Sequence, residues 1–207
     1  MIKGSGVVIK PAKRIVDEIT GAMKKLEEEI KKCRRCELWK TRTKPVVGEG
    51  SLSAKLMLVG EAPGYYEDLK GIPFVGKAGK VLDELLGSVG LGRSDVYIAN
   101  MLKCRPPGNR NPATEELKAC TPYLDAQIEI IEPAVIATLG NFSLGYIFDK
   151  FGLKKDKISK LHGKVFKIST IVGIKKVVAL YHPAVATYNP GMKGILTDDF
   201  KVLARCL

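Results

Sequence analysis

The sequence predicts an α/β fold in which helices cover both faces of a largely parallel sheet. Short apolar runs alternate with segments whose apolar residues recur at helical spacing, a pattern typical of parallel strands joined by helical crossovers. In addition, the chain has 207 residues, is 45% hydrophobic and contains no low-complexity stretch that would divide it. We therefore expect one core and a single domain over residues 1–207.

The first half of the chain is predicted to contain two helices and two strands. Apolar residues at helical spacing opposite a charged face predict a helix over residues 15–33. The run KLMLVG predicts a buried strand over 55–60, and a helix over 78–90 and a strand over 95–104 follow. Between them, GEAPGYYED at 60–68 is expected to form a loop at the end of the first strand.

The second half continues the alternation. A helix is predicted over 114–133, with Thr114 as its cap and Pro122 as a point of interruption or kinking. The remaining elements are a strand over 134–140, a helix over 141–152, a strand over 175–183 and a closing helix over 196–207.

Three unusual loops follow the predicted strands. They are GEAPGYYED, NMLKCRPPGNRNP at 100–112 and YHPAVATYNP at 181–190. Ligands of open α/β sheets bind beyond the carboxyl ends of the strands. The convergence of these loops is therefore the first evidence for a functional site.

The formal charge of +12 favours a polyanionic partner, with nucleic acid modestly ahead of a merely soluble basic protein. The N-terminal MIKGSGVVIKPAKR lacks the apolar stretch of a signal peptide, and it serves either as an interaction tail or as the entry to the first helix. No run approaches the ~20 apolar residues of a membrane helix. A cytoplasmic protein without membrane contact is expected.

Four cysteines have the spacing of ligands. Cys33 and Cys36 form a C-x2-C pair flanked by basic residues, and Cys104 and Cys120 lie further along the chain. In a cytosolic protein such cysteines are more often metal ligands or free thiols than disulfides. Four thiolates can bind zinc or an iron–sulfur cluster, and the spacing does not choose between them. The alternative is that Cys104 and Cys120 are ordinary buried thiols, and Cys206 is expected in the core.

A near match to a phosphate-binding loop occurs in GIPFVGKA at 71–78. Ala78 stands where the hydroxyl residue that binds magnesium is required, and the preceding YYEDLK is not a strand. A nucleotide hydrolase is therefore disfavoured. Phe74 within this stretch fits a pocket wall and a core position equally well.

Taken together, the motifs resemble those of the family 4 uracil-DNA glycosylases, the thermostable iron–sulfur branch of that superfamily. C-x2-C, GEAPGYYED, PFVGKAG, NMLKCRPPGNRNP with Cys120, and YHPA occur in the family's order, from about Cys33 to Pro190. The resemblance implies a central four-stranded parallel sheet flanked by helices. It also implies a [4Fe-4S] cluster on Cys33, Cys36, Cys104 and Cys120, with a structural role in ordering a loop near DNA.

The resemblance implies hydrolysis of the N-glycosidic bond of uracil in single- or double-stranded DNA, leaving an abasic site. Glu67 matches the residue that positions and polarises the water, and its charge faces the oxocarbenium-like sugar. Glu61 and Ala62 match positions whose backbone lines the uracil pocket, with the Glu61 side chain a secondary catalytic candidate. Asp68 is expected to be a solvated loop charge.

Base recognition is likewise assigned by resemblance. Phe74 matches the stacking aromatic, and Asn100 matches the residue that reads uracil, because an amide accepts from N3–H and donates to O4. His182 in YHPA matches the histidine that donates towards uracil O2, whereas His162 is expected to be an ordinary loop residue. The roles of Tyr65 and Tyr66 are open, because many family members carry acidic residues there.

Contacts with DNA are less well defined by the sequence. The segment 185–194 after the HP motif matches the region that wedges into the duplex, but Ala184 departs from the common pattern. The candidate phosphate contacts are Lys103, Arg105, Arg110 and Lys193.

Several broader expectations complete the prediction. A monomer is expected, and a sliding-clamp motif is not evident. The Lys- and Glu-rich composition hints at a thermophile. No motif places a lysine to attack the sugar, so strand cleavage is not expected. The alternative function is a non-catalytic iron–sulfur or zinc protein that binds nucleic acid.

Overall fold

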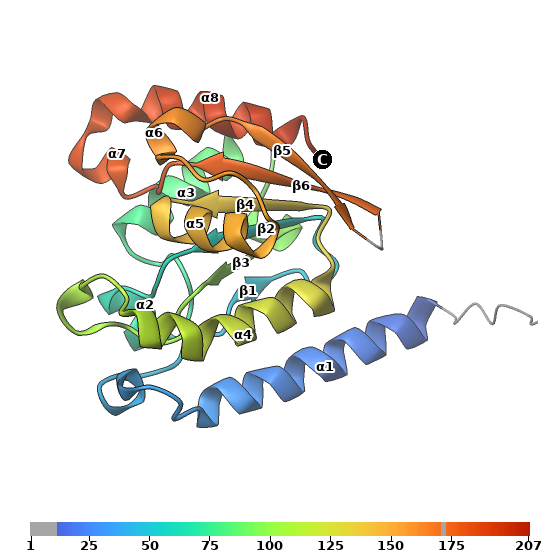
Figure 1. Cartoon of the computed structure of the whole chain (residues 1–207), viewed down its shortest axis with the longest axis vertical. Coiled ribbons are helices and arrows are strands. Elements are labelled where there is room, and N and C mark those ends of the chain that lie inside the picture. The colour runs from blue at the N-terminus through green and yellow to red at the C-terminus, as the bar shows by residue number, and fades with distance from the viewer. Residues whose placement is uncertain (1–11, 171–172) are drawn as a thin grey trace, which may run out of the picture.

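The computed structural model describes residues 12–170 and 173–207 (Figure 1). The N-terminal segment for which we considered an interaction tail or a helix entry lies largely outside these residues. Within the described ranges, no helix is both long and apolar enough to cross a membrane.

The sheet has six strands in the order β1-β3-β2-β4-β6-β5. The strands are β1 Glu49–Gly50, β2 Leu56–Gly60, β3 Val96–Asn100, β4 Val135–Leu139, β5 Val165–Thr170 and β6 Gly173–Leu180. Strand pairs β2/β3, β2/β4 and β4/β6 are parallel, whereas β1 and β5 pair antiparallel with their neighbours at the two edges. The sheet is therefore mixed and six-stranded: the central strands β3, β2, β4 and β6 are parallel to one another, and the expected central parallel sheet of four strands left out the two antiparallel edge strands.

The two missed strands lack a sequence pattern strong enough to find them. β1 is only two residues long, and the burial of β5 is broken by exposed positions because it lies at an edge. Across the β5/β6 ladder, Lys167 is the register partner of Lys176. Charged residues of this kind are common on edge strands and obscure the apolar run that identifies a central strand.

Helices cover both faces of the sheet. They are α1 Ala12–Lys32, α2 Tyr65–Lys70, α3 Lys77–Gly87, α4 Thr114–Ile131, α5 Asn141–Lys150, α6 Ile158–Leu161, α7 Val185–Tyr188 and α8 Lys193–Ala204. Figure 1 shows α1 and α4 along one side of the sheet and α8 along the other. The described part of the chain thus forms three layers, with helices outside and the sheet between them.

The alternation of side chains in β2 explains the two cores. Leu56 and Leu58 point to the cluster formed with α3 and α8, whereas Met57 and Val59 point to the cluster formed with α1, α4 and α5. All five residues of the strand are buried. Such a strand is apolar throughout, which is why the run KLMLVG identified it correctly.

Two details of α4 differ from expectation. The backbone amide of Ala113 donates to the Glu116 carboxylate at 2.8 Å. Glu116, and not Thr114, therefore caps the N-terminus of the helix by accepting from a backbone amide there. The helix also continues through Pro122. Burial of Leu124 and Ile128 against the sheet offsets the hydrogen bond that proline cannot donate.

The carboxyl ends of β2, β3 and β6 lie at one edge of the sheet. Gly60 and Asn100, the last residues of β2 and β3, are register partners in the parallel ladder. The three unusual loops follow these strand ends. A further difference appears here, because YYED is not loop but the start of helix α2.

Candidate active site

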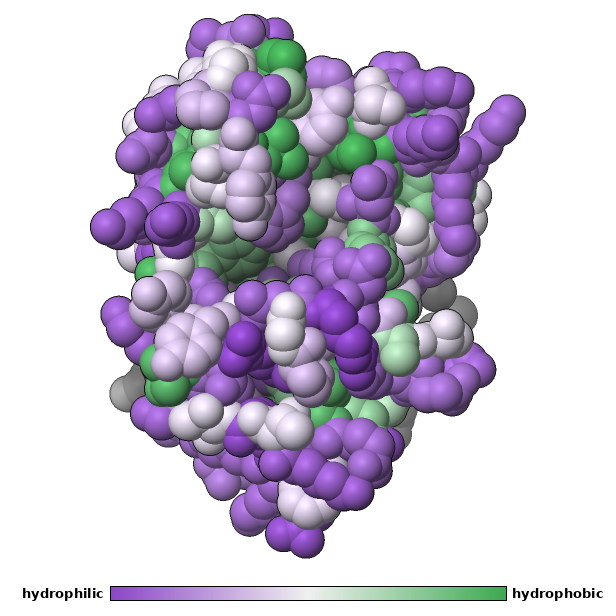
Figure 2. Space-filling view, turned by 90° about the vertical axis from the view of Figure 1, so that its left-hand side faces the viewer, coloured by the Kyte–Doolittle hydropathy of each residue, from purple (hydrophilic) through white to green (hydrophobic). Residues whose placement is uncertain are grey.

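A cavity of ≈310 Å³ lies beyond these strand ends. Figure 2 views the molecule from this edge and shows its surface hollowed near the middle. All six residues predicted to act on or bind a base line the cavity: Glu61, Ala62, Glu67, Phe74, Asn100 and His182. Residues from the loop after β3 and from the start of the HP segment complete the lining, including Pro106, Asn109, Arg110 and Ala184.

Asn100 offers an unsatisfied acceptor to this cavity. The residue is 2% exposed, and its Oδ1 is the single buried side-chain nitrogen or oxygen atom in the described ranges that has no hydrogen-bond partner. A Cβ on Gly60 would lie 2.3 Å from this oxygen and 2.9 Å from the Phe74 ring, so only glycine leaves room for both. A buried acceptor without a partner costs about 1–3 kcal/mol. Such a cost points to a ligand that donates to Asn100.

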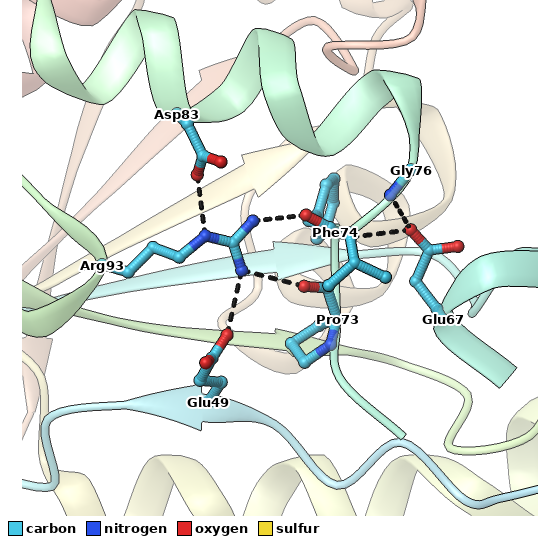
Figure 3. A network of polar contacts seen from close by, with 8 residues as sticks. Glu49, Glu67, Pro73, Phe74, Gly76, Asp83 and Arg93 are labelled. Carbon is cyan, nitrogen blue, oxygen red and sulfur yellow. Dashed lines mark hydrogen bonds and ion pairs between the residues drawn. The ribbon is translucent and has the colours of Figure 1, made fainter. Parts of the chain in front are cut away.

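The Glu67 carboxylate is fixed by backbone amides. Its Oε1 accepts from the amides of Val75 and Gly76, each at 2.9 Å (Figure 3). A Cβ on Gly64 would lie 2.7 Å from Oε2, so that glycine leaves room for the carboxylate. No cation pairs with Glu67 within the part of the chain that the structure describes. The carboxylate thus presents a negative charge at a defined position in the cavity.

His182 is held as a neutral donor. The amide of Ala184 donates to Nδ1 at 3.1 Å, which leaves the ring proton on Nε2. Removal of the imidazole from water lowers the pKa of His182 to about 4, and the charge of Glu67 opposes this shift only in part. At neutral pH the ring therefore offers an N–H without carrying a charge.

Phe74 is both a core residue and a wall of the cavity. It is 6% exposed and packs with α3 and α8, yet it also lines the cavity. Its φ of +53° lies in the left-handed region, which is strained for a bulky residue. A Cβ on Gly79 would lie 1.7 Å from the Phe74 carbonyl oxygen, so that glycine permits the close approach of α3. The two interpretations of Phe74 are thus both correct.

Glu61 and Ala62 follow β2 directly. The carbonyl of Glu61 accepts from the amide of Leu102 at 3.0 Å, which ties the loop after β2 to the loop after β3. Burial raises the pKa of the Glu61 carboxyl. Backbone pairing therefore fixes this corner of the cavity.

Two residues predicted to be exposed, Asp68 and Lys103, are in fact buried. Asp68 is 4% exposed and accepts from the amide of Thr43 with both oxygens at 3.0 Å, so it is not a solvated loop charge. His162 lies in the turn after α6, as expected of a loop residue, and its Nδ1 lies 3.0 Å from the Asp199 carboxylate. The assignment of Lys103 as a phosphate contact was also wrong, as its burial shows.

Lys103 is 1% exposed. Its Nζ donates to the carbonyl of Asn100 at 2.8 Å and to Gln127 at 2.6 Å, so it cannot reach a phosphate. Burial lowers the pKa of Lys103 to about 8. The other three basic candidates stay predictions. Arg105 lies over the Tyr65 ring at 5.1 Å, and Arg110 and Lys193 pair with Glu116 and Glu84.

The four predicted ligand cysteines gather around a second cavity. Cys33, Cys36, Cys104 and Cys120 all line it, whereas Cys206 does not. Arg42 donates to the Cys104 sulfur and the amide of Lys103 donates to the Cys120 sulfur, both at 3.2 Å. Cys206 is half-buried and packs beside the core around α8, broadly as expected.

Burial raises the pKa of the thiols of Cys36 and Cys104, and raises that of Cys120 to about 12. Among the described residues, no three His, Cys, Asp or Glu side chains are arranged to hold a metal ion. The cavity nevertheless brings together four sulfur donors from distant parts of the chain, and thiolates are the ligands of iron–sulfur clusters.

Sequence reasoning missed Arg93. This residue precedes β3 and contacts the carbonyl oxygens of Pro73 and Phe74 (Figure 3). Its position in the turn GRSD resembles that of any exposed basic residue. No local pattern could have identified it, because its partners are far away in the sequence.

Comparison with known proteins gives a consistent result. The sequence model of the Uracil DNA glycosylase superfamily matches residues 47–204. The Type-4 uracil-DNA glycosylase of Archaeoglobus fulgidus is 50% identical over 173 residues, which cover 84% of this chain and 87% of that protein. The protein of the same name from Saccharolobus solfataricus is 47% identical over 184 residues, which cover 88% and 85%. The one from Thermotoga maritima is 47% identical over 181 residues, covering 86% and 91%.

Proposed function

The chain belongs to the uracil DNA glycosylase superfamily, and on this basis we propose that it excises uracil from DNA. The reaction is hydrolysis of the bond between uracil N1 and deoxyribose C1′, which leaves an abasic site. The observation that carries this proposal is the unpaired Oδ1 of Asn100 in the cavity. An amide in this position accepts from uracil N3–H, whereas cytosine has no proton at N3 to donate.

The remaining cavity residues supply the chemistry that such a cleavage requires. The breaking bond leaves its electron pair on the base, so negative charge develops on uracil and positive charge on the sugar. In our proposal, the Nε2–H of His182 donates to uracil O2 as this negative charge forms. A neutral histidine suits this role, because its pKa of about 4 leaves it uncharged at neutral pH.

Glu67 acts on the sugar and on the attacking water. Its carboxylate orients the attacking water and stabilises the positive charge on the sugar, and it takes up a proton as the water oxygen bonds to C1′. The amides of Val75 and Gly76 keep the carboxylate in place for this task. The Phe74 ring stacks on the flipped base, and the backbone of Glu61 and Ala62 lines the pocket around it.

We also propose that Cys33, Cys36, Cys104 and Cys120 hold a [4Fe-4S] cluster. The support is the donor set, since these four thiols line one cavity and the Type-4 relatives match over most of the chain. A bound cluster would cross-link the segments after α1, after β3 and in α4. The cysteines thereby order the loop that carries Pro106, Asn109 and Arg110 at the active site.

DNA is the partner in this proposal. Single- and double-stranded uracil-containing DNA are both candidate substrates, with Arg105, Arg110 and Lys193 as phosphate contacts. Tyr188, which is 88% exposed on α7, lies in the segment proposed to enter the duplex. We further propose a single domain and a monomer. The thermophilic origin stays a prediction, and a possible sliding-clamp contact stays untested.

A direct test uses a labelled oligonucleotide with one uracil. After incubation, alkali cleaves any abasic site, and a thymine-containing strand serves as the control. Product from uracil alone, on single- or double-stranded DNA, would support the proposed function. No product from protein with its cluster intact, even at elevated temperature, would instead favour the non-catalytic nucleic-acid-binding alternative, which the cavity and the enzyme relatives do not favour.

A further inference from the structure

Arg93 lies behind the wall of the cavity and does not line it. It sits in the short turn Arg93–Asp95 between Gly92 and β3, and its side chain is 25% exposed. The guanidinium contacts four acceptors from three parts of the fold (Figure 3). Such a set of contacts exceeds what a surface arginine needs for solubility or a single ion pair.

Two of the acceptors are carboxylates that orient the guanidinium. Nε donates to Asp83 of α3 at 2.7 Å, and Nη1 donates to Glu49 of β1 at 2.9 Å. The planar guanidinium presents its N–H groups in fixed directions. Anchoring two of its sides to carboxylates therefore determines where the remaining N–H groups point.

The other two acceptors are backbone carbonyls. Nη1 also donates to the Pro73 oxygen at 3.0 Å, and Nη2 donates to the Phe74 oxygen. These are the carbonyls on either side of the strained, left-handed Phe74 backbone. A residue in this region persists only where its surroundings hold it. Arg93 supplies that support together with the close approach of α3 at Gly79.

The same segment binds Glu67 on its opposite flank. The amides of Val75 and Gly76, which follow Phe74 directly, donate to the Glu67 carboxylate. Figure 3 shows Arg93 and Glu67 on the two sides of residues 73–76. A displacement of this segment would therefore move both the stacking ring and the carboxylate.

We propose that Arg93 is a positioning residue for uracil excision: by holding the carbonyls of Pro73 and Phe74, it places the Phe74 ring for stacking and the Glu67 carboxylate for water activation. This inference rests on the proposed function and extends it. Arg93 touches neither base nor sugar and acts through the 73–76 backbone. Misplacement of reacting groups by about 1 Å can reduce a rate 100-fold, so the effect of losing this support is measurable.

The test compares Arg93→Lys and Arg93→Gln with two matched controls. Glu49→Gln and Asp83→Asn each remove one carboxylate partner but leave the arginine and its carbonyl contacts. For every variant, three quantities are measured: the single-turnover excision rate on a single-stranded uracil oligonucleotide, inhibition by free uracil, and Tm. Free uracil reports on the stacking wall without requiring DNA binding or bond cleavage.

We expect both Arg93 variants to excise at least about tenfold more slowly than wild type, because a lysine point charge or one amide cannot hold both carbonyls. Inhibition by free uracil should weaken by a similar factor. The two controls should lower Tm but keep excision within about threefold of wild type. Combining Arg93→Lys with Phe74→Leu should give less than the product of the two separate effects, because both act through one ring.

The inference is overturned if Arg93→Lys excises and binds uracil like wild type. It is also overturned if the excision rates of all four variants simply follow their Tm values. If neither Arg93 variant folds, the Glu49→Gln/Asp83→Asn double variant decides, because it removes both carboxylates that orient the guanidinium. Slower excision and weaker inhibition by free uracil, measured well below its Tm, support the inference, and wild-type values of both reject it. Failure of the proposed function itself would appear separately, as wild-type protein that excises no uracil.

Discussion

The His182 imidazole stacks on the Phe74 ring, with 5.5 Å between the ring centroids and 27° between the planes. The two side chains come from the end of β6 and from the loop before α3, so the stack joins distant segments across the cavity. The contact shields the imidazole from water and thereby favours its neutral form. The proposed base-stacking wall and the proposed hydrogen-bond donor thus support each other.

The shielding of His182 from water predicts a specific pH dependence of stability. The pKa of His182 is about 4 in the folded protein and near its ordinary value of 6.5 in the unfolded chain. Between these values the unfolded chain binds the extra proton, so the stabilisation is complete above about pH 6.5 and is lost as the pH falls towards 4. Thermal unfolding at about pH 7 and pH 5 should show a larger loss of Tm for wild type than for His182→Asn. Equal losses would contradict a histidine that its surroundings keep neutral.

Glu67→Gln should abolish most excision while the protein stays folded. The glutamine oxygen can still accept from Val75 and Gly76, but the charge that activates water and faces the sugar is gone. We expect a loss of at least about 100-fold in single-turnover rate with little change in Tm. The neighbouring Asp68→Asn is the control: it perturbs the bond to Thr43 and should lower Tm but retain excision. Retained activity in Glu67→Gln would remove this carboxylate from the mechanism.

Asn100→Ala should separate activity from stability. The change removes a buried oxygen that has no partner, which offsets the packing it loses, so Tm should shift by less than about 4 °C. Excision should fall by at least about 100-fold because the reader of uracil N3–H is lost. Thr138→Val, on strand β4, which β2 separates from β3, and outside the cavity, should leave excision unchanged. A large drop in Tm together with normal excision would show that Asn100 is structural.

Replacing a cavity cysteine should remove the cluster. For Cys104→Ser or Cys120→Ser, we expect the visible iron–sulfur absorbance to be lost and Tm to fall. The iron content should drop below the value of about four atoms per chain that an intact cluster gives. Cys206→Ser is the matched control, because this thiol lies outside the cavity and donates to the Val202 carbonyl. Zinc in place of iron in the wild-type protein would refute the cluster but not the ligand set.

The protein should not form a covalent bond with the sugar. No lysine lines the active-site cavity of the described structure, and the nearby Lys103 is buried with both Asn100 and Gln127 as partners. Borohydride added during the reaction with uracil-containing DNA should therefore trap no imine, and the abasic strand should stay intact until alkali is added. A trapped protein–DNA adduct would contradict this prediction, because it would show that an amine of the protein attacks the sugar.

The central strands could be predicted because they are buried on both sides. The continuous apolar run of β2 has to be buried in a folded protein, and the same is true of the run of β4. By contrast, β5 carries exposed residues and Lys167, so its sequence resembles that of a loop. The helix α2 was also missed, because the glycine and proline before Tyr65 favour a turn and the helix is only six residues long.

The cavity residues were predicted from short motifs, whereas their supports were not. Asn100 and His182 lie at strand ends, where sequence order alone brings them to one edge of the sheet. Lys103 was misread because a lysine in a strongly basic chain is normally exposed, and its burial depends on Gln127, 24 residues away. Arg93 could not be found because its partner Glu49 is 44 residues distant.

The position of Lys103 has a consequence at the level of the cell. Its backbone amide donates to the sulfur of Cys120, and its ammonium group donates to the carbonyl of Asn100. The strand that would read the base is therefore attached directly to the segment that would hold iron. Iron starvation or an oxidant that dismantles the cluster would disturb both at once. We expect mutations from deaminated cytosine to accumulate under such stress without any change in the gene for this protein.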